Sequence, residues 1–315
     1  MRPPSSSEQS TIIQVCELHE KEHRLRPYYH RCVVLGSWFI KYGGHADLEL
    51  EYKTQSYLWS MADGHQEALR IPQVLAYFSP KKQWAYLVTE RIDPILPANT
   101  SPQAVATAIE WLCSVPPPSG LTLGSVGGGG ARHKLFKDFE APLSFSSSET
   151  LQNYMNLALQ NIHSGDRPAY MNLLNDRLIF TQSDMDESNF ALDEHQRVCM
   201  FDFRDVGVLP ESFASYTLGD SANPFIKSVA KHLDWVNDHN RKSMARAGVI
   251  LQTLGDATFG LTSRSYTWTL DYFNVSILSR PLRTFKINTL IILRYMYPLV
   301  NFLLAPFCIL EASLL

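Results

Sequence analysis

The sequence predicts an α+β fold with two lobes: a small antiparallel sheet carrying one helix, followed by a larger, mainly helical lobe. Short β-branched and aromatic runs fill much of the first 92 residues, which is typical of strands. A proline-rich connector, "DPILPANTSP" at 93–102, follows them. Beyond it, apolar residues recur at helical spacing. The predicted boundaries are therefore 11–92 for the first lobe and 93–260 for the second.

The first lobe opens with two predicted strands and a helix. The stretch "RCVVLGSWFIKYG" (31–43) is apolar, β-branched and aromatic, and Gly36-Ser37 supplies a turn in its middle. From Asp47 to about Gly64, apolar residues recur at the spacing of a helix, with Asp47 expected as its N-cap.

A predicted hairpin completes this lobe. The runs "PQVLAYF" (72–78) and "WAYLVTERI" (84–92) are joined by the polar "SPKKQ". Residues 1–10, "MRPPSSSEQS", are polar and are expected to be disordered; they lack the apolar region of a secretory signal.

The second lobe is predicted from helical patterns separated by loops. Ser101 is expected to cap a helix that runs to Cys113, with Pro102 in its first turn. Further helices are expected at about 149–162, 166–176, 223–236 and 241–254, and a loop at 116–148.

Composition excludes several classes of function. The chain has 315 residues and a net charge of −3, without the clustered basic residues of a nucleic-acid-binding surface. Its five cysteines are scattered and form no CxxC pair, so neither a zinc site nor a disulfide framework is indicated. A reducing, cytoplasmic location is the plain expectation. The oligomeric state is not predicted.

The segment 178–210 carries the most specific chemical pattern. An apolar run leads into "TQSDMDESNF", and a second apolar run leads into "DFRDVG". Asp184 is followed by Asn189 and, after the second run, by Asp202. In phosphoryl transfer from ATP, one carboxylate accepts the proton of the attacking hydroxyl, while an amide and a second carboxylate hold magnesium. Taken alone, the acidic stretch is more often a solvated turn; the second aspartate at this distance favours the site.

That chemistry also needs a cation on the phosphates. Lys41 lies in the predicted strand "WFIKYG", and the predicted helix after it carries Glu49 and Glu51 near its start. A strand lysine held by a helix glutamate is the arrangement that binds the α- and β-phosphates in kinase-like sites. Glu51 is the favoured partner.

These pieces, in this order, resemble the aminoglycoside phosphotransferase and choline kinase-like family, which has the protein-kinase-like fold, and more closely a set of uncharacterised fungal phosphotransferase-domain proteins. The resemblance covers roughly 30–255 and rests on "FIKYG", "ELEYKTQSYLW", "AYLVTERID", "GSVGGGGARHKLFKDFEAP" and the segment from "FTQSDMDESNF" to "FASYTL".

The resemblance implies an ATP- and Mg²⁺-dependent phosphotransferase acting on a hydroxyl of a small molecule. It implies these roles: Asp184 as the catalytic base, Asn189 and Asp202 as magnesium ligands, Lys41 on the phosphates, and the backbone from Glu90 to Ile92 against the adenine.

Two departures from the family pattern leave a second interpretation open. Many relatives carry histidine two residues before the catalytic aspartate, where this chain has Gln182, and no G-x-G-x-x-G precedes Lys41. A catalytically weak or inactive nucleotide-binding or interaction module on the same fold is therefore the alternative. The glycine run 127–130 is either a flexible loop beside the substrate or a plain linker.

The C-terminal tail, 261–315, is atypical of the family. Its last part, 287–315, is strongly apolar but is interrupted by Arg294, Pro298, Asn301 and Pro306. A weak membrane anchor, a packed hydrophobic helix and an atypical chain end are the three interpretations.

Overall fold

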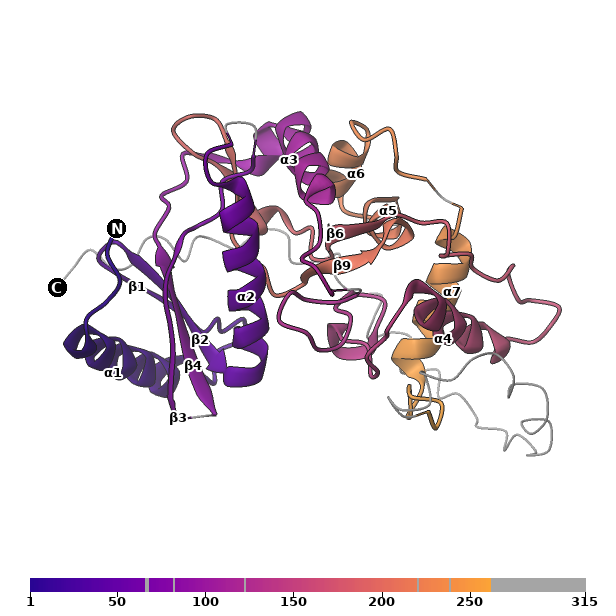
Figure 1. The fold of residues 1–315 in the computed structure, drawn as a ribbon, viewed down its shortest axis with the longest axis horizontal. Coiled ribbons are helices and arrows are strands. Elements are labelled where there is room, and N and C mark those ends of the chain that lie inside the picture. The colour runs from indigo at the N-terminus through magenta and orange to yellow at the C-terminus, as the bar shows by residue number, and fades with distance from the viewer. Residues whose placement is uncertain (66–67, 82, 122, 220, 238, 262–315) are drawn as a thin grey trace. The chain divides into compact units, whose positions relative to one another are not determined.

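Helices and short antiparallel sheets make up the protein (Figure 1). The computed structural model describes residues 1–261 except 66, 67, 82, 122, 220 and 238. The described residues belong to one compact unit, so the two predicted lobes form a single body. The mixed α+β class expected from the sequence is confirmed.

The described part of the chain contains the following helices and strands, in chain order. They are α1 (Ser6–His23), β1 (Cys32–Leu35), β2 (Trp38–Gly44), α2 (His45–Ala62), β3 (Val74–Lys81), β4 (Trp84–Glu90), β5 (Leu96–Pro97), η1 (Ala98–Thr100), α3 (Pro102–Ser114), η2 (Lys137–Phe139), α4 (Ser148–Gln160), β6 (Leu178–Gln182), η3 (Glu187–Asn189), β7 (Phe190–Leu192), β8 (Val198–Met200), β9 (Val206–Pro210), α5 (Glu211–Gly219), α6 (Pro224–Ala230) and α7 (Arg241–Thr253).

The first sheet has the strand order β1-β2-β4-β3, with every pair antiparallel. Because side chains alternate along a strand, Ile40 and Tyr42 of β2 lie on one face and Lys41 lies on the other. Ile40 and Tyr42 pack with Ile12 of α1. Figure 1 shows the sheet between α1 and α2. The alternation therefore assigns Lys41 to the face that α2 covers.

Helix α1 differs from two predictions, disorder at 1–10 and a single helix in the first lobe. The helix begins at Ser6 because Ser5 and Glu8 form a capping box, each side chain accepting a hydrogen bond from the other's backbone amide. Ile12 and Cys16 are buried against the sheet, which stabilises the helix. Its burial against the sheet is a tertiary contact, which the polar sequence of the first ten residues does not reveal.

Helix α2 begins two residues before the predicted N-cap. The residue in the cap position is Gly44, and Asp47 lies in the first turn. There its carboxylate is favourably placed near the positive end of the helix dipole.

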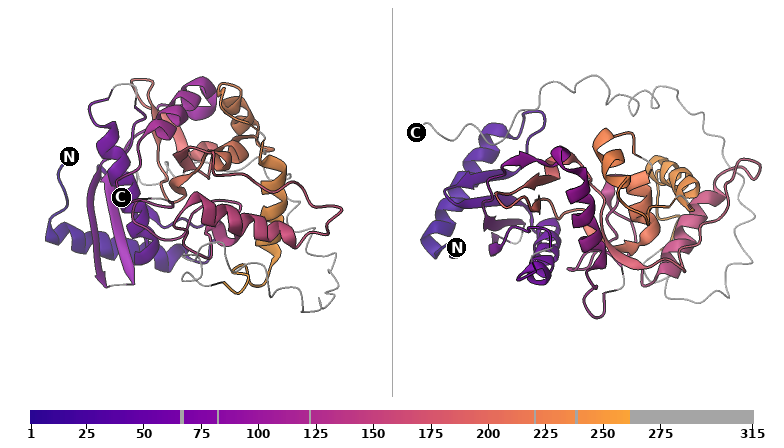
Figure 2. Two further views of the ribbon diagram at one scale, coloured as in Figure 1. Left: turned by 45° about the vertical axis from the view of Figure 1, so that its right-hand side comes forward. Right: turned by 90° about the horizontal axis from the view of Figure 1, so that it is seen from above.

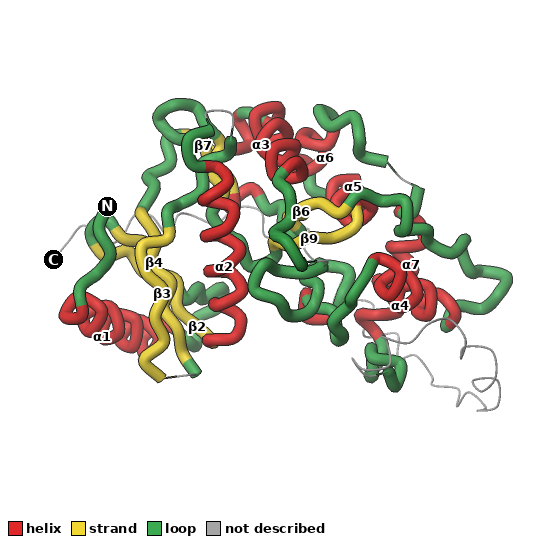
Figure 3. The backbone as a smooth tube through the Cα atoms, viewed as in Figure 1, coloured by secondary structure: helices red, strands yellow, loops and turns green. Residues whose placement is uncertain are grey.

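The second lobe is built around two small sheets, β6-β9 and β5-β7-β8 (Figure 3). One apolar cluster joins α3 and α6 to the strands of both sheets, and a second joins α4, α5 and α7. Figure 2 shows these helices from two further directions. The helix predicted from 241 to 254 is present as α7, whereas the one predicted at 223–236 is shorter, as α6.

The helix predicted at 166–176 is absent, and this stretch is extended or turning. Side chains from neighbouring helices form hydrogen bonds with its backbone N–H and C=O groups. Asn156 of α4 bonds both backbone groups of Met171, and Asn240 bonds both backbone groups of Asn172. These tertiary hydrogen bonds replace those that a helix would make.

Only residue 261 of the predicted tail belongs to the described part, so the three interpretations of 287–315 concern residues outside it. Within the described part, no helix combines the length and apolar character needed to cross a bilayer.

His133, in the predicted loop at 116–148, is fully buried. Its Nδ1 accepts a hydrogen bond from the Leu135 amide, so Nε2 carries the proton and donates to Thr217 Oγ1 at 2.8 Å or to the Phe213 carbonyl at 3.2 Å. Burial, aided by Lys134, lowers the pKa of His133 to about 3. The imidazole is therefore neutral and hydrogen-bonded within the core.

This burial predicts a pH dependence of stability. The pKa of His133 is lower in the folded chain than in the unfolded one, so the unfolded chain binds the extra proton as pH falls below about 6.5 and stability is lost. Between pH 7 and pH 5 the loss from this one group should be about 2 kcal/mol.

The variant His133→Gln has no such titration. Urea unfolding across this pH range should show the stability difference between wild type and variant shrinking toward pH 5. A constant difference would mean that His133 titrates in the same way in both states.

Candidate active site

Lys41 is the centre of the cluster of predicted site residues. It lies in β2, opposite Cys32 of β1 and Leu87 of β4, so strands fix its backbone on both sides. Its Nζ lies 2.7 Å from Glu51 Oε1 and 3.1 Å from Asp202 Oδ1. One ammonium group thus joins the sheet, α2 and the turn after β8.

Glu51 lies on the buried face of α2 and is 3% exposed. Burial raises the pKa of its carboxyl, and Lys41 and a backbone hydrogen bond from Phe203 oppose that rise. Glu49, the other candidate partner, pairs instead with Lys53 one turn along the same helix. Helical geometry separates the two acids, because residues two apart point in different directions.

Asp202 follows β8 and is partly exposed. Its Oδ1 accepts hydrogen bonds from Lys41 Nζ at 3.1 Å and from the Arg204 amide at 2.9 Å. Burial favours the neutral acid, but the charge of Lys41 and the Arg204 amide outweigh it and lower the pKa of Asp202. The carboxylate is ionised, and its second oxygen is left for another ligand.

Burial likewise opposes a charge on Lys41, but Glu51 and Asp202 outweigh it and raise the pKa of the ammonium. Lys41 therefore remains charged throughout the physiological range.

Asp184 and Asn189 meet in the turn between β6 and β7. Asn189 Nδ2 donates to the Asp184 carboxylate and to the Asp184 carbonyl, both at 3.0 Å. The Asp184 side chain reaches solvent, yet the surrounding protein partly desolvates it and raises its pKa, with Asn189 opposing the shift. The surroundings of Asp184 thus raise its pKa, whereas those of Asp202 lower the pKa of that residue.

Gln182 connects the two halves of this cluster. Its Nε2 donates to the Asp202 carbonyl at 2.8 Å, and its Oε1 accepts from the Asp184 amide at 3.1 Å. An imidazole could make the same two bonds, with one ring nitrogen as donor and the other as acceptor. The amide of glutamine therefore makes both of the bonds that a histidine at this position could make.

Glu90 and Ile92 lie apart from this cluster at the end of β4. The Glu90 side chain accepts hydrogen bonds from Arg70 and from the Gln73 amide, both at 2.6 Å, so it has a structural role of its own. The Glu90 amide donates to the Gln73 carbonyl, and the Arg91 amide donates to the Ser37 carbonyl.

Asp205 is an acidic neighbour that the sequence pattern did not single out. Its Oδ1 is buried and has no hydrogen-bond partner among the described residues. Burial, reinforced by the charge of Asp202, raises its pKa to about 6. In the sequence, Asp205 is visible only as the last residue of "DFRD", three positions after Asp202. Its burial depends on tertiary contacts, which the sequence does not reveal.

The donor atoms fit a hard divalent cation. With Asn189 Nδ2 engaged by Asp184, the amide oxygen of Asn189 is the atom left to bind a metal, and Asp202 offers its second carboxylate oxygen. Both are the oxygen ligands that Mg²⁺ prefers. In the described part of the chain, no group of three or more His, Cys, Asp or Glu side chains could hold a metal.

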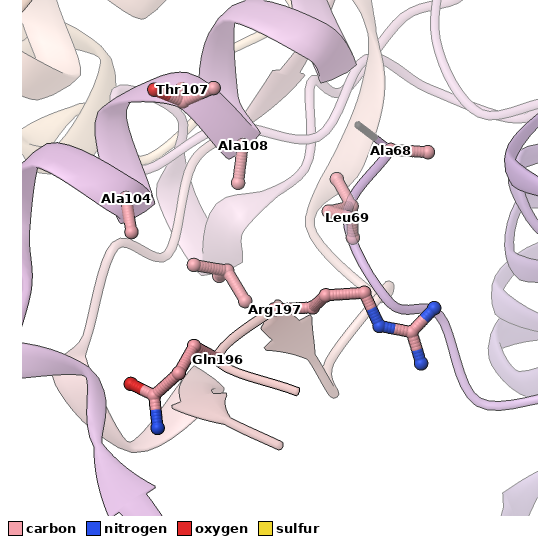
Figure 4. Close-up of a pocket in the computed structure, with 8 residues that line it drawn as sticks. Ala68, Leu69, Ala104, Thr107, Ala108, Gln196 and Arg197 are labelled. Carbon is pink, nitrogen blue, oxygen red and sulfur yellow. The ribbon is translucent and has the colours of Figure 1, made fainter. Parts of the chain in front are cut away.

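A separate hollow of about 270 Å³ lies where α3 faces the β7–β8 turn (Figure 4). Ala104 and Ala108 line it on one side and Gln196 and Arg197 on the other. None of the residues that line it belongs to the Lys41 cluster, so its position gives no support to the proposed chemistry.

Comparison with known proteins found similarity in structure alone. No family model matches the chain, and no curated protein does. A GDP complex of wild-type aminoglycoside 2′-phosphotransferase-IIIa matches 76% of this chain and 87% of its own, at 11% identity and a TM-score of 0.45. A streptomycin–ATP complex of aminoglycoside phosphotransferase APH(2″)-IIa matches 78% and 97%, at 14% identity and a TM-score of 0.39.

A putative fructosamine-3-kinase from Haemophilus somnus 129PT matches 75% of this chain and 79% of its own, at 12% identity and a TM-score of 0.42. The similar structures are thus small-molecule phosphotransferases, the group that the sequence resembles. Nothing in these comparisons concerns the fungal proteins.

The bridging role of Gln182 predicts a selective stability effect. Gln182→Leu leaves the Asp202 carbonyl and the Asp184 amide without their partner, which should lower the free energy of unfolding by about 1–3 kcal/mol. Gln182→His should retain most of the stability, because imidazole can make both bonds. Urea unfolding of the two variants measures this; equal losses would contradict the bridge.

Proposed function

We propose that this protein is a phosphotransferase that moves the γ-phosphoryl group of ATP to a hydroxyl of a small molecule, with Mg²⁺ as its cofactor. The observation that carries the proposal is the position of Lys41 between Glu51 and Asp202, at 2.7 Å and 3.1 Å. A lysine held in this way presents a fixed positive charge beside a carboxylate that can bind metal. Phosphoryl transfer requires that combination, because its transition state is stabilised mainly by positioning and charge neutralisation.

In the proposed reaction, Asp184 orients the acceptor hydroxyl and accepts its proton. The acceptor oxygen forms a bond to the γ-phosphorus as the bond from that phosphorus to the β-phosphate oxygen breaks, and ADP leaves. The raised pKa of Asp184 suits it to hold this proton transiently, because an efficient general base has a pKa near the working pH. Asn189 limits the carboxylate to one orientation through its 3.0 Å hydrogen bond.

Lys41 would contact the α- and β-phosphates, with Glu51 holding the ammonium in place. Asn189 and Asp202 would hold Mg²⁺, which neutralises charge on the phosphates when it is bound. The backbone from Glu90 to Ile92 would meet the adenine. Within the described part of the chain, the Ile92 amide makes no hydrogen bond to the protein, so it could donate to a purine nitrogen.

The first test separates catalysis from binding at one residue. Asp184→Asn keeps the size of the side chain but removes the base, so kcat should fall by about 100- to 10,000-fold. The affinity for MgADP, measured by calorimetry, should stay close to that of the wild type.

Glu187→Gln is the matched control, since it also removes an acid from the same turn. That side chain is exposed and contacts Asn99. It should change neither quantity; wild-type turnover in Asp184→Asn would refute the assigned base.

The second test concerns the metal. Asp202→Asn removes a charged ligand, so affinity for MgADP should fall by about tenfold or more. The loss should be much smaller for ADP measured without Mg²⁺, because that measurement leaves out the metal. An equal loss with and without Mg²⁺ would argue against Asp202 as a metal ligand.

The wild-type protein also discriminates between enzyme and binding module. A thermal shift with MgATP followed by a screen of hydroxyl compounds for ADP release should give turnover for at least one class of acceptor. Nucleotide binding without turnover across such a library would favour the alternative, an inactive nucleotide-binding module.

A further inference from the structure

A buried arginine lies in the segment Gly124–Glu140, which we call the glycine-rich segment. Arg132 is 2% exposed, and its guanidinium lies 2.5 Å from Asp47 Oδ1 and 3.1 Å from Glu140 Oε2. Among the described residues its Nε has no hydrogen-bond partner. A buried charge persists only where its carboxylate partners compensate the loss of water, so this arginine is fixed in position.

The glycine-rich segment contacts α2 on both sides of Glu51. Arg132 binds Asp47, four positions before Glu51, and the Val126 amide donates to Thr54 Oγ1, three positions after it, at 3.2 Å. Residues separated by three and four positions share one face of a helix. The face that presents Glu51 to Lys41 is therefore held one turn above and one turn below.

Glycine allows this close approach. A Cβ on Gly127 would lie 2.8 Å from Leu50 Cδ2 and 3.2 Å from Leu50 Cα, so a larger residue would push the segment away from α2. Gly128, with φ of +93°, makes a turn that strongly favours glycine. The run 127–130 is thus packed against the helix, which differs from both interpretations of the sequence, a flexible loop and a plain linker. Figure 3 shows the loop between α3 and α4 beside α2.

The other side of the glycine-rich segment is bonded to the catalytic elements. Gly124 exchanges backbone hydrogen bonds with Val208 of β9, at 2.9 Å and 2.8 Å. The Lys134 amide donates to Ser183 Oγ at 2.8 Å, directly before Asp184. The segment therefore joins α2 to β9, the partner strand of β6, and to the turn that carries the proposed base.

We propose that Arg132 is a positioning residue that holds α2 in the orientation in which Glu51 meets Lys41. This inference rests on the proposed function for its consequence, nucleotide binding, but the contact itself is independent of nucleotide. Without the Arg132–Asp47 pair, the start of α2 loses its attachment to the glycine-rich segment. Glu51 then moves away from Lys41, and the phosphate-binding lysine loses its partner.

The test measures Lys41 directly, by its rate of acetylation with N-hydroxysuccinimidyl acetate at constant pH in the full-length protein, followed by peptide mass spectrometry. Only the neutral amine reacts, and its population rises about tenfold for each unit by which the pKa falls. Lys227 on α6 is the internal reference. Arg132→Met should accelerate acetylation of Lys41 by about twofold or more, since pairing with Glu51 is lost.

The decisive comparison is a double-mutant cycle. Glu51→Gln should itself accelerate acetylation of Lys41, and adding Arg132→Met to it should change the rate little, because the effect acts through Glu51. The same acceleration in both backgrounds, or none in either, would overturn the proposal. Arg177→Met is the matched control: it removes a 2.7 Å ion pair with Glu211 and should leave Lys41 unchanged.

A milder variant covers the case in which Arg132→Met does not fold. Asp47 is 59% exposed, so Asp47→Asn removes the charge from the α2 side of the pair with little disturbance of packing. It should accelerate acetylation in the same direction and to a smaller extent; an unchanged rate would overturn the proposal.

A MgADP titration of the wild type separates the two proposals. If the wild type does not bind MgADP, the proposed function fails, while the acetylation rates still decide the role of Arg132. If it binds MgADP and the acetylation cycle is additive, the nucleotide site that the proposed function needs is supported and the role of Arg132 fails.

Discussion

The ammonium group of Lys41 is the interaction on which the rest of the site depends. It lies between the carboxylates of Glu51 and Asp202. Glu51 is in α2, and Asp202 is in a turn 161 positions after Lys41 in the chain. A charge that is largely removed from water needs a partner of opposite charge to compensate the lost hydration. Removing one partner leaves the other charge buried without compensation, which destabilises the fold. The sheet, α2 and the turn after β8 are therefore constrained to meet at one point, and the packing of each is arranged around it.

This constraint also divides the acids of the site into two kinds. Lys41 holds Asp202 in its ionised form, whereas Asp184, away from that charge, has its pKa raised by partial burial. Two aspartates with environments that shift their pKa values in opposite directions suit the two tasks proposed for them, a metal ligand and a proton acceptor. Gln182 bonds the backbone of both and so fixes the distance between them.

Two contacts of the second lobe support the first. The glycine-rich segment bonds α2 through Arg132, and His133 anchors the same segment in the core beside α5. The neighbouring arginine and histidine thus have different physical roles. Arg132 pairs its buried charge with Asp47 of α2, whereas His133 remains neutral within apolar packing.

Part of the fold followed from local pattern. Strand alternation around Lys41 and the turn at Gly36 are properties of a few consecutive residues, and the structure contains both. Helix α1 and the extended stretch at 166–176 did not follow, because one is stabilised by contact with the sheet and the other by side chains of Asn156 and Asn240. Tertiary contacts overrode local propensity in both.

The sequence by itself determined the spacing of Asp184, Asn189 and Asp202, the strand position of Lys41, and hence the kind of chemistry to look for. Only the tertiary structure decided that Glu51 and not Glu49 meets Lys41, that Gln182 joins the two aspartates, and that Arg132 is buried against α2. The physical reason is range: spacing and alternation act over a few residues, whereas burial and charge pairing depend on segments that folding brings together from distant parts of the chain.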